Sequence, residues 1–263
     1  MDVRGAKILL TGATGGIGHT LAAELAGRGG EMVLTGRRID LLEPLAERLG
    51  VRAIPADLTD RDAIDKLLRD AGDIDILIAN AALPAGGLLT EFSMAELDRA
   101  LDVNLRAPIV MAKLAAQQMA ARRRGHLVFM SSLAGKTATA LDSLYSATKF
   151  GLRGFALALR EDMRPHNVGV STLFPGYIRD AGMVVDSGVT LPRGIGTRSP
   201  RDVAQATIRA IEKNRAEIDV APPNLRLIAL LGGIAPTLTA AIQRALGAET
   251  ISRTLAEGQR YKN

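Results

Sequence analysis

Three residues in the middle of the chain carry the groups of acid–base chemistry at a useful spacing. Tyr145 and Lys149 are four residues apart in a helix-like segment, so their side chains share one helix face. A free tyrosine has a pKa of about 10, too high for a base at neutral pH, and a nearby ammonium group favours the phenolate. Ser132 ends a strand-like segment, where its hydroxyl would hydrogen-bond a substrate oxygen. These residues predict proton transfer at a bound oxygen atom.

A glycine-rich turn, TGATGGIG over residues 11–18, follows the first strand-like segment and precedes a helix-like one. Glycines at positions 12, 16 and 18 allow a tight turn, close approach of the backbone to a pyrophosphate, and packing of helix against strand. The helix N-terminus offers free N–H groups and a positive dipole to phosphate. We therefore predict a dinucleotide site at this turn.

The second strand-like segment ends in Gly36-Arg37-Arg38, where a site that prefers NAD usually has an acidic residue. The planar donors of arginine suit the 2′-phosphate of NADP. We therefore predict NADP(H) as the cofactor and regard NAD(H) as the weaker alternative. The remaining interpretation is that both arginines only solvate a loop.

The elements that must position these residues alternate along the chain. We expect strands over residues 7–11, 32–35, 51–55, 74–79, 126–131, 168–174 and 217–220. Most are continuous apolar runs, typical of parallel strands buried on both faces. Ser93 and Glu96 have the spacing of a capping box for a long helix toward Arg124, and Ser199-Pro200 begins another helix. This order predicts an α/β fold with a doubly wound parallel sheet, the Rossmann fold.

The composition changes at Ala221-Pro222-Pro223, so we predict one catalytic domain over residues 1–221 and a helical extension over 222–263 packed on it. Residues 227–243 carry no charge, and Pro236 interrupts them. The favoured interpretation is a pair of helices that cap the pocket or pack on a neighbouring subunit. A surface-lying membrane contact is the second interpretation, helped by five basic against two acidic residues over 225–263. A membrane span is the third.

Composition excludes several classes of protein. Of the 263 residues, 47% are hydrophobic and 23% charged, enough apolar material for a core. The chain has no cysteine, and its three histidines lack metal-ligand spacing, so we expect no metal site. The net charge is +5 without a basic run interleaved with aromatic residues, so we expect no nucleic-acid partner. No signal-like segment begins the chain, which predicts a cytoplasmic protein, membrane-peripheral if the extension contacts lipid.

Taken together, these motifs resemble the short-chain dehydrogenase/reductase family over nearly all of residues 5–221. The matching motifs are Thr11-Gly12-x-x-x-Gly16-x-Gly18, Asp57-Leu58, Asn80-Ala81, Asn104, Ser132, Tyr145-x-x-x-Lys149 and Pro175-Gly176. The resemblance implies hydride transfer between a nicotinamide cofactor and a carbonyl carbon. It also implies a homodimer or homotetramer built on the long helices around Asn104 and Tyr145.

The resemblance further implies individual roles. Tyr145 would be the general acid or base, and Ser132 would orient the carbonyl. Lys149 would bind the nicotinamide ribose and lower the pKa of Tyr145, and Asn104 would support a water between Lys149 and solvent. Asp57 and Leu58 would bind adenine, Asn80 the adenosine ribose, and Ile178 the nicotinamide carboxamide. The complete predicted cofactor set is Gly12, Thr14, Gly16, Ile17, Gly18, Arg37, Arg38, Asp57, Leu58, Asn80, Ala81, Tyr145, Lys149, Pro175, Gly176 and Ile178.

Three positions depart from the family pattern. Ala82 stands where the family often has glycine, Asp180 stands where a threonine often bonds the carboxamide, and Thr14 stands where many NADP-type members carry a basic residue. The NADP prediction therefore rests on Arg37, helped by Arg38.

These observations predict an NADP(H)-dependent alcohol dehydrogenase or carbonyl reductase. The substrate could be a 3-oxoacyl thioester, a lipid-like ketone, or a small aldehyde or sugar, and the apolar extension favours a hydrophobic one. The alternative is a non-catalytic, dinucleotide-sensing protein of the same fold. Intact Ser132, Tyr145 and Lys149 argue against that alternative, because a sensor needs no such set.

Overall fold

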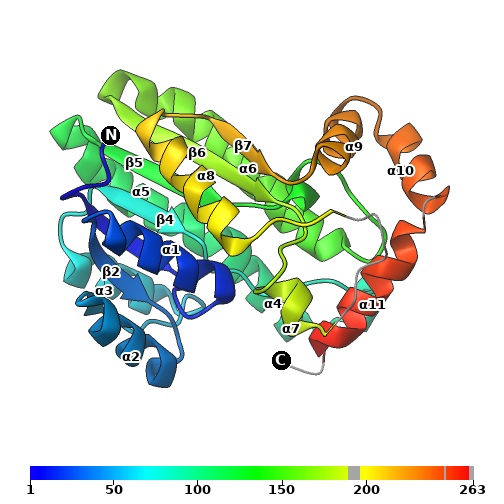
Figure 1. The fold of residues 1–263 in the computed structure, drawn as a ribbon, viewed down its shortest axis with the longest axis horizontal. Coiled ribbons are helices and arrows are strands. Elements are labelled where there is room, and N and C mark those ends of the chain that lie inside the picture. The colour runs from blue at the N-terminus through cyan, green and yellow to red at the C-terminus, as the bar shows by residue number, and fades with distance from the viewer. Residues whose placement is uncertain (189–195, 246, 261–263) are drawn as a thin grey trace.

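The structure is a computed structural model that describes residues 1–188, 196–245 and 247–260. Over these residues seven parallel strands form one sheet in the order β3-β2-β1-β4-β5-β6-β7 (Figure 1). The strands are β1 (Lys7–Thr11), β2 (Glu31–Thr35), β3 (Arg52–Ala53), β4 (Ile76–Ala79), β5 (Gly125–Met130), β6 (Val168–Pro175) and β7 (Glu217–Val220). The chain winds outward from β1 in one direction and then from β4 in the other, which confirms the predicted doubly wound α/β fold.

Helices cover both faces of the sheet. One face carries α1 (Gly16–Gly27), α2 (Ile39–Leu49) and α8 (Pro200–Glu212). The other carries α3 (Arg61–Ala71), α5 (Ala107–Arg122) and α6 (Ser143–Met163). Two apolar cores result, and successive strand residues alternate between them. In β1, Ile8 and Leu10 pack under α1 and α8, while Leu9 packs with the α3 and α5 side. Because both faces are buried, the strands are continuously apolar.

The third predicted strand is shorter than its apolar run. Only Arg52 and Ala53 form β3, although the amide of Ile54 still donates to the carbonyl of Leu34 at 2.9 Å. Pro55 follows and has no N–H to continue the pairing.

The predicted helix caps are present. Ser93 Oγ accepts from the backbone N–H of Glu96, and the Glu96 carboxylate accepts from the backbone N–H of Ser93. This capping box begins α4 (Met94–Leu101). Ser199 and Asp202 make the same exchange at the start of α8. The predicted long helix toward Arg124 contains one irregularity: residues 102–106 form a π-helical turn between α4 and α5. π-turns of this kind are frequent at functional sites.

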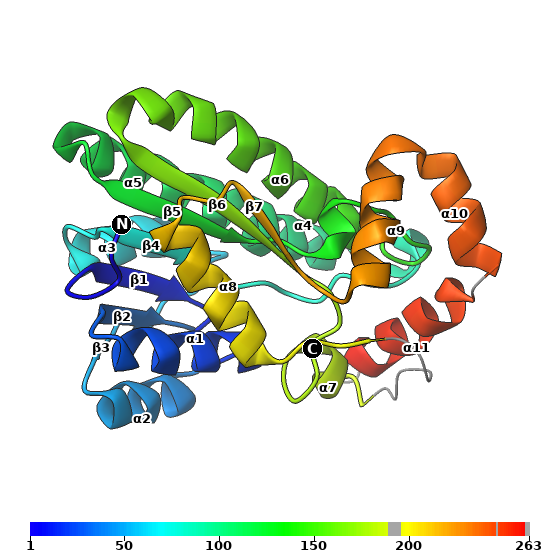
Figure 2. The same cartoon turned by 45° about the horizontal axis from the view of Figure 1, so that its top comes forward.

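The C-terminal extension forms α9 (Pro223–Ile234), α10 (Pro236–Ala245) and α11 (Ala248–Arg260). These helices stand together at the end of the molecule where the strands end, away from α2 (Figures 1 and 2). Gly232 of α9 lies against Thr137, and the Gln243 side chain donates to the Thr137 hydroxyl at 3.3 Å. Gly258 of α11 packs on the carbonyl of Ser187, directly after the short helix α7 (Met183–Asp186). Within the described part of the chain, every helix is too short or too polar to cross a bilayer.

Candidate active site

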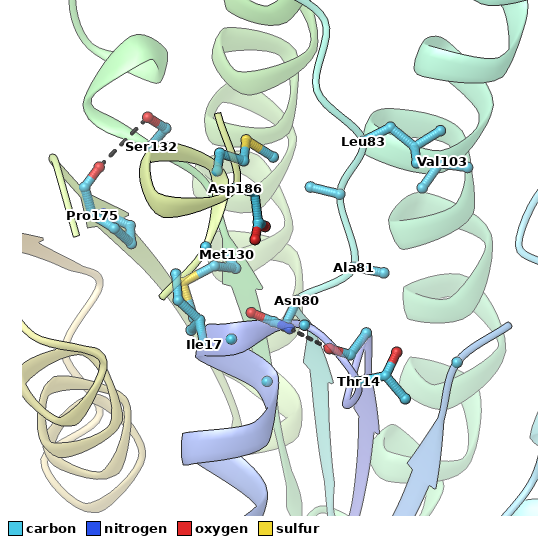
Figure 3. A pocket seen from close by; sticks show the side chains of 18 of the residues that line it. Thr14, Ile17, Asn80, Ala81, Leu83, Val103, Met130, Ser132, Pro175 and Asp186 are labelled. Carbon is cyan, nitrogen blue, oxygen red and sulfur yellow. Dashed lines mark hydrogen bonds between the residues drawn. The ribbon is translucent and has the colours of Figure 1, made fainter. Parts of the chain in front are cut away.

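One pocket of about 450 Å³ opens at the carboxyl ends of the strands. Every residue of the predicted cofactor set lines it, together with Ser132. Residues from the ends of β1, β2, β4, β5 and β6 therefore meet there, as the rule for doubly wound sheets requires (Figure 3). Asn104 is the one predicted site residue that is not part of the lining.

The glycine turn exposes bare backbone to the pocket. Gly12 has a φ of +66°, and a Cβ at this position would lie 2.8 Å from the Cα of Ala81. A Cβ on Gly18 would collide with the carbonyl oxygen of Gly12, and one on Gly16 with the side chain of Ala181. Glycine is thus required at all three positions, and Gly16, Ile17 and Gly18 at the N-terminus of α1 line the pocket.

The ends of β1 and β4 are joined by a small polar network. The Thr11 hydroxyl accepts from the backbone amides of Asn80 and Ala81, each at 3.0 Å. The Asn80 side chain donates to the carbonyl oxygens of Thr11 at 3.0 Å and Gly12 at 3.3 Å. Asn80 therefore fixes the glycine turn from the neighbouring strand (Figure 3).

Basic and acidic groups meet at the end of β2. Arg38 Nη2 donates to the carbonyl oxygen of Thr14 at 2.7 Å and lies 3.3 Å from its hydroxyl. Burial acts to raise the pKa of Asp57, but hydrogen bonds from Thr59 and the charge of Arg37 outweigh it and lower the pKa. Asp57 is therefore a carboxylate that accepts from the amide and hydroxyl of Thr59, both at 2.9 Å.

The catalytic candidates converge at the other end of the pocket. Lys149 is 1% exposed, and its Nζ donates to the Met130 carbonyl oxygen at 2.9 Å. The same Nζ lies 5.5 Å from the ring centroid of Tyr145, one helical turn earlier on α6. Ser132 Oγ accepts from the amide of Ala134 at 3.2 Å and points toward the carbonyl of Pro175 (Figure 3). Strand β5 and helix α6 thus bring the three groups to one place.

An ion-pair cluster holds the loop that follows Ser132. Lys136 Nζ lies 2.6 Å from Asp219 and 3.0 Å from Glu217 on the edge strand β7. Arg153 of α6 donates to the same Glu217 at 2.7 Å. Because Lys136 is nearly buried, these contacts fix the serine loop against both β7 and α6.

The pKa of Tyr145 is raised in the free protein, whereas the sequence favoured a lowered value. Burial raises its pKa, the nearby Asp142 carboxylate raises it further, and a hydrogen bond with Ser132 acts in the opposite direction. Burial also lowers the pKa of Lys149 to about 8. Lys149 does not lower the pKa of Tyr145 here, because its ammonium group donates to the Met130 carbonyl oxygen and is itself desolvated. Tyr145 is consequently protonated at neutral pH in the free protein.

Asn104 lies in the π-turn and uses both ends of its amide on one neighbour. Its Oδ1 accepts from the amide of Leu83 at 2.6 Å, and its Nδ2 donates to the Leu83 carbonyl at 2.9 Å. Leu83 and Val103 line the pocket (Figure 3), so Asn104 supports the backbone of one lining residue and directly follows another. In this geometry its amide supports the Leu83 loop.

Two departures from the family pattern have a structural outcome. Ala82 lines the pocket. Asp180 has a φ of +69°, is exposed, and pairs with Arg179 at 3.4 Å, so its carboxylate faces away from the pocket lining.

Several lining residues were not predicted. Among them are Thr35, Ala56, Leu83, Val103, Met130, Ser131 and Asp186. Thr35 and Met130 end strands β2 and β5 and Ser131 follows β5, so the rule that ligands bind beyond strand ends could have found them. Asp142, which acts on Tyr145, was also missed, although it stands only three residues before the tyrosine at the N-cap of α6.

The pocket fits a nicotinamide dinucleotide on its own geometry. The glycine turn brings backbone without side chains to the pocket next to the N-terminus of α1, and a Cβ on Gly12, Gly16 or Gly18 would collide with the residues packed around the turn. Thr35 is one of the residues that line the pocket, and its buried Oγ1 has no hydrogen-bond partner among the described residues. A buried polar atom of this kind calls for a ligand or water. Arg37 and Arg38 add positive charge at the adjoining edge.

Comparison with known proteins agrees with this geometry. A model of the family described as short chain dehydrogenase matches residues 6–189. The ketoacyl reductase HetN of Nostoc sp. is 31% identical over 97% of this chain and 94% of that protein. Dehydrogenase/reductase SDR family member 7B of Xenopus laevis is 31% identical over 97% of this chain and 85% of that protein. A solved short-chain dehydrogenase from Sphingobium yanoikuyae in complex with NADPH is 26% identical, with a TM-score of 0.76 over 89% of this chain and 95% of that one. The chain therefore belongs to the short-chain dehydrogenase/reductase family of oxidoreductases.

Proposed function

We propose that this protein is an NADP(H)-dependent carbonyl reductase or alcohol dehydrogenase in which Tyr145 is the general acid and base. The observation that carries the proposal is the convergence of Ser132, Tyr145 and Lys149 on the pocket that also contains the glycine turn. A catalytic domain over residues 1–221 is part of the proposal, supported by the position of every lining residue between Gly12 and Asp186.

The nicotinamide ring of the bound cofactor supplies or accepts the hydride. In reduction, the Ser132 hydroxyl donates a hydrogen bond to the substrate carbonyl oxygen and orients it. The Tyr145 hydroxyl delivers its proton to the same oxygen, and the raised pKa keeps that proton available at neutral pH. The ammonium group of Lys149 then stabilises the tyrosinate from one helical turn away.

NADP(H) is the preferred cofactor in this proposal. Arg38 brings a guanidinium to the glycine turn, and the charge of Arg37 acts on Asp57 at the adenine end. Two guanidinium groups at this edge suit the extra phosphate of NADP. The NADPH complex of the Sphingobium relative supports the same choice.

We propose a hydrophobic ketone or 3-oxoacyl thioester as substrate. Leu83, Val103, Met183 and Val184 give the pocket apolar walls. The name of the Nostoc relative, a ketoacyl reductase, points to the same class of compound. Ketones of increasing chain length and a 3-oxoacyl thioester, each assayed with NADPH, test this choice, and activity restricted to short polar aldehydes would contradict it.

The decisive experiment separates binding from chemistry. The Tyr145→Phe protein should bind NADPH with unchanged affinity and lose reductase activity by about 10²-fold or more. Ser143→Ala, an exposed hydroxyl at the first position of the same helix, is the matched control and should retain activity. Full activity of Tyr145→Phe would refute the mechanism. Normal nucleotide binding by the wild-type protein without turnover of any carbonyl compound would favour a sensing role.

We also propose a homodimer or homotetramer built on α5 and α6. Phe150 and Leu157 on α6 are 40% and 41% exposed, which leaves apolar surface on this helix for a second copy. Light scattering of the purified protein should give a multiple of the 27.8 kDa chain mass, and Phe150→Glu should reduce it to one chain. A wild-type protein that scatters as a single chain would contradict this assembly.

A further inference from the structure

The two helices α9 and α10 present an apolar face to solvent. Ile234 is 74% exposed and Leu230 is 60% exposed, values more typical of charged surface residues. The face consists of the outward residues Leu227, Leu230, Ile234, Leu238 and Ile242. Their spacings of three and four within each helix place them on one side of that helix. We call this set the apolar face.

Another side of each of these helices is firmly packed. Ala229 and Thr239 are each 2% exposed, and Gln243 is bonded to Thr137. A Cβ on Gly232 would lie 2.5 Å from the Thr137 hydroxyl, so α9 is seated closely on the loop that follows Ser132. These contacts fix the rotation of both helices. Turning either helix to bury the apolar face would break them, so the face points outward.

The charges within the α9–α10 stretch of the sequence have one sign. Between residues 221 and 248 the charged residues are Arg226 and Arg244, at the start of α9 and the end of α10, and both are exposed. The first carboxylate beyond them, Glu249, is paired with Arg253 at 3.0 Å. The apolar face is thus flanked by arginines without an acidic residue in the same stretch of sequence.

We propose that the apolar face docks on an anionic lipid surface, with α9 and α10 lying in the plane of the interface. The leucine and isoleucine side chains would enter the boundary between headgroups and acyl chains, and Arg226 and Arg244 would bind lipid phosphates. A 12-residue α9 and a 10-residue α10, broken at Ala235, are far shorter than the roughly 20 residues of a span. They suit a surface-lying contact.

A second copy of the chain fits this face less well. A twofold interface is self-complementary, so it would bring the arginines of one copy toward those of the other around the same apolar centre. The α9–α10 stretch, residues 223–245, offers these charges no carboxylate in return. Lipid phosphates supply the missing negative charge.

Flotation with lipid vesicles tests the proposal on the whole protein. Wild-type protein should float with phosphatidylcholine vesicles that contain phosphatidylglycerol, and rising salt should weaken the binding. The double variant Leu230→Gln/Ile234→Gln should bind at least about tenfold more weakly. The matched control is Ile39→Gln/Leu41→Gln on α2, where two residues 50% and 45% exposed lie far from the apolar face, and it should bind like the wild type.

Other outcomes overturn the proposal. Equal flotation of wild type and the Leu230→Gln/Ile234→Gln variant would show that the face does not carry the contact. Failure of the wild type to float with anionic vesicles would exclude the contact directly. Light scattering in the absence of lipid tests whether a second copy of the chain covers the face instead. A lower particle mass for the Leu230→Gln/Ile234→Gln variant than for the wild type would make the face an interface between copies. Far-UV circular dichroism should be unchanged in both variants, because all four substituted side chains are exposed.

Discussion

Arg38 reaches back from the end of β2 to the glycine turn, where its Nη2 lies 2.7 Å from the carbonyl oxygen of Thr14. Neither Thr14 nor Gly15 is basic, so the turn itself lacks the charge that many NADP-type members of the family carry there. In this chain the guanidinium group of Arg38, which follows the neighbouring strand β2, contacts the same turn. Arg37 stays near Asp57, so the two arginines serve different parts of the pocket edge.

The first prediction concerns nucleotide choice. Arg38→Ala should weaken NADPH binding by about tenfold to hundredfold, because a hydrogen bond to a charged group contributes about 1.5–3 kcal/mol. NADH lacks the phosphate and should bind with little change. Fluorescence titration with each nucleotide measures both affinities. Arg28→Ala, which removes only an exposed pair with Glu212, is the control. An equal loss for both nucleotides would assign Arg38 a purely structural role.

The second prediction uses two glycines of one helix. Gly18→Ala should abolish nucleotide binding, because its Cβ would meet the backbone carbonyl of Gly12 and force the turn to move. Gly27→Ala, near the end of α1, meets no atom within 4 Å and should bind nucleotide normally. It should also be slightly more stable, by up to about 1 kcal/mol, since alanine favours a helix. Binding titrations and thermal unfolding of both variants check the contrast, and normal nucleotide affinity in Gly18→Ala would disprove the close approach.

The third prediction is a pH profile for carbonyl reduction. Lys149 loses its charge as the pH rises through about 8, whereas Tyr145, whose pKa is raised, keeps its proton over the same range. The value of kcat/KM should therefore be level near neutral pH and decline above about 8, when the tyrosinate formed in the reaction loses its cationic partner. A Lys149→Arg protein that retains activity should lack this decline, because arginine stays charged. A rate that rises through pH 8 would contradict the assignment.

The fourth prediction concerns stability. Burial lowers the pKa of His126 to about 3, against 6.5 for an exposed histidine. Below pH 6.5 the imidazole of His126 is protonated in the unfolded chain but stays neutral in the folded protein. The contribution of His126 to the free energy of unfolding is therefore fully present above pH 6.5 and is lost as the pH falls toward 3. The loss should reach about 2 kcal/mol at pH 5.

Urea unfolding at pH 7.5 and pH 5 measures this loss. His126→Gln has no titrating imidazole, so the difference between the two pH values should shrink by that amount. Carboxylates titrate in both proteins, so the comparison of wild type with His126→Gln separates the contribution of His126 to the pH dependence from theirs. An unchanged pH difference in His126→Gln would show that the imidazole is accessible to protons when folded.

Local signals in the sequence were sufficient for the sheet and for most of the pocket. Strands such as β1 and β5 are continuously apolar because both faces are buried, and that pattern is visible without tertiary information. The strand order then brings Gly12, Asn80 and Ser132 to one edge, since parallel strands end on the same side.

What the sequence could not predict depends on contacts between distant segments. The position of α9 is set by Gly232 against Thr137, a contact that no periodicity in the sequence reveals. Burial is the main cause of the raised pKa of Tyr145, and it too depends on how the elements around the pocket pack. The π-turn at Asn104 is hidden for the same reason, because residues 94–122 follow one helical pattern. The predicted water-supporting role of Asn104 stays a prediction. Its hydrogen bonds to the Leu83 backbone give it a second role, the support of the Leu83 loop.

The contact between Ala181 and Gly16 has a kinetic consequence. Ala181 lies against the glycine turn, and Met183 and Val184, two and three residues further on, line the wall of the same pocket. One short segment therefore borders both the glycine turn and the apolar wall, and we expect it to act as a gate for nucleotide and carbonyl compound alike. We expect ordered kinetics, with the nucleotide first to enter and last to leave, and a turnover rate governed by opening of that gate.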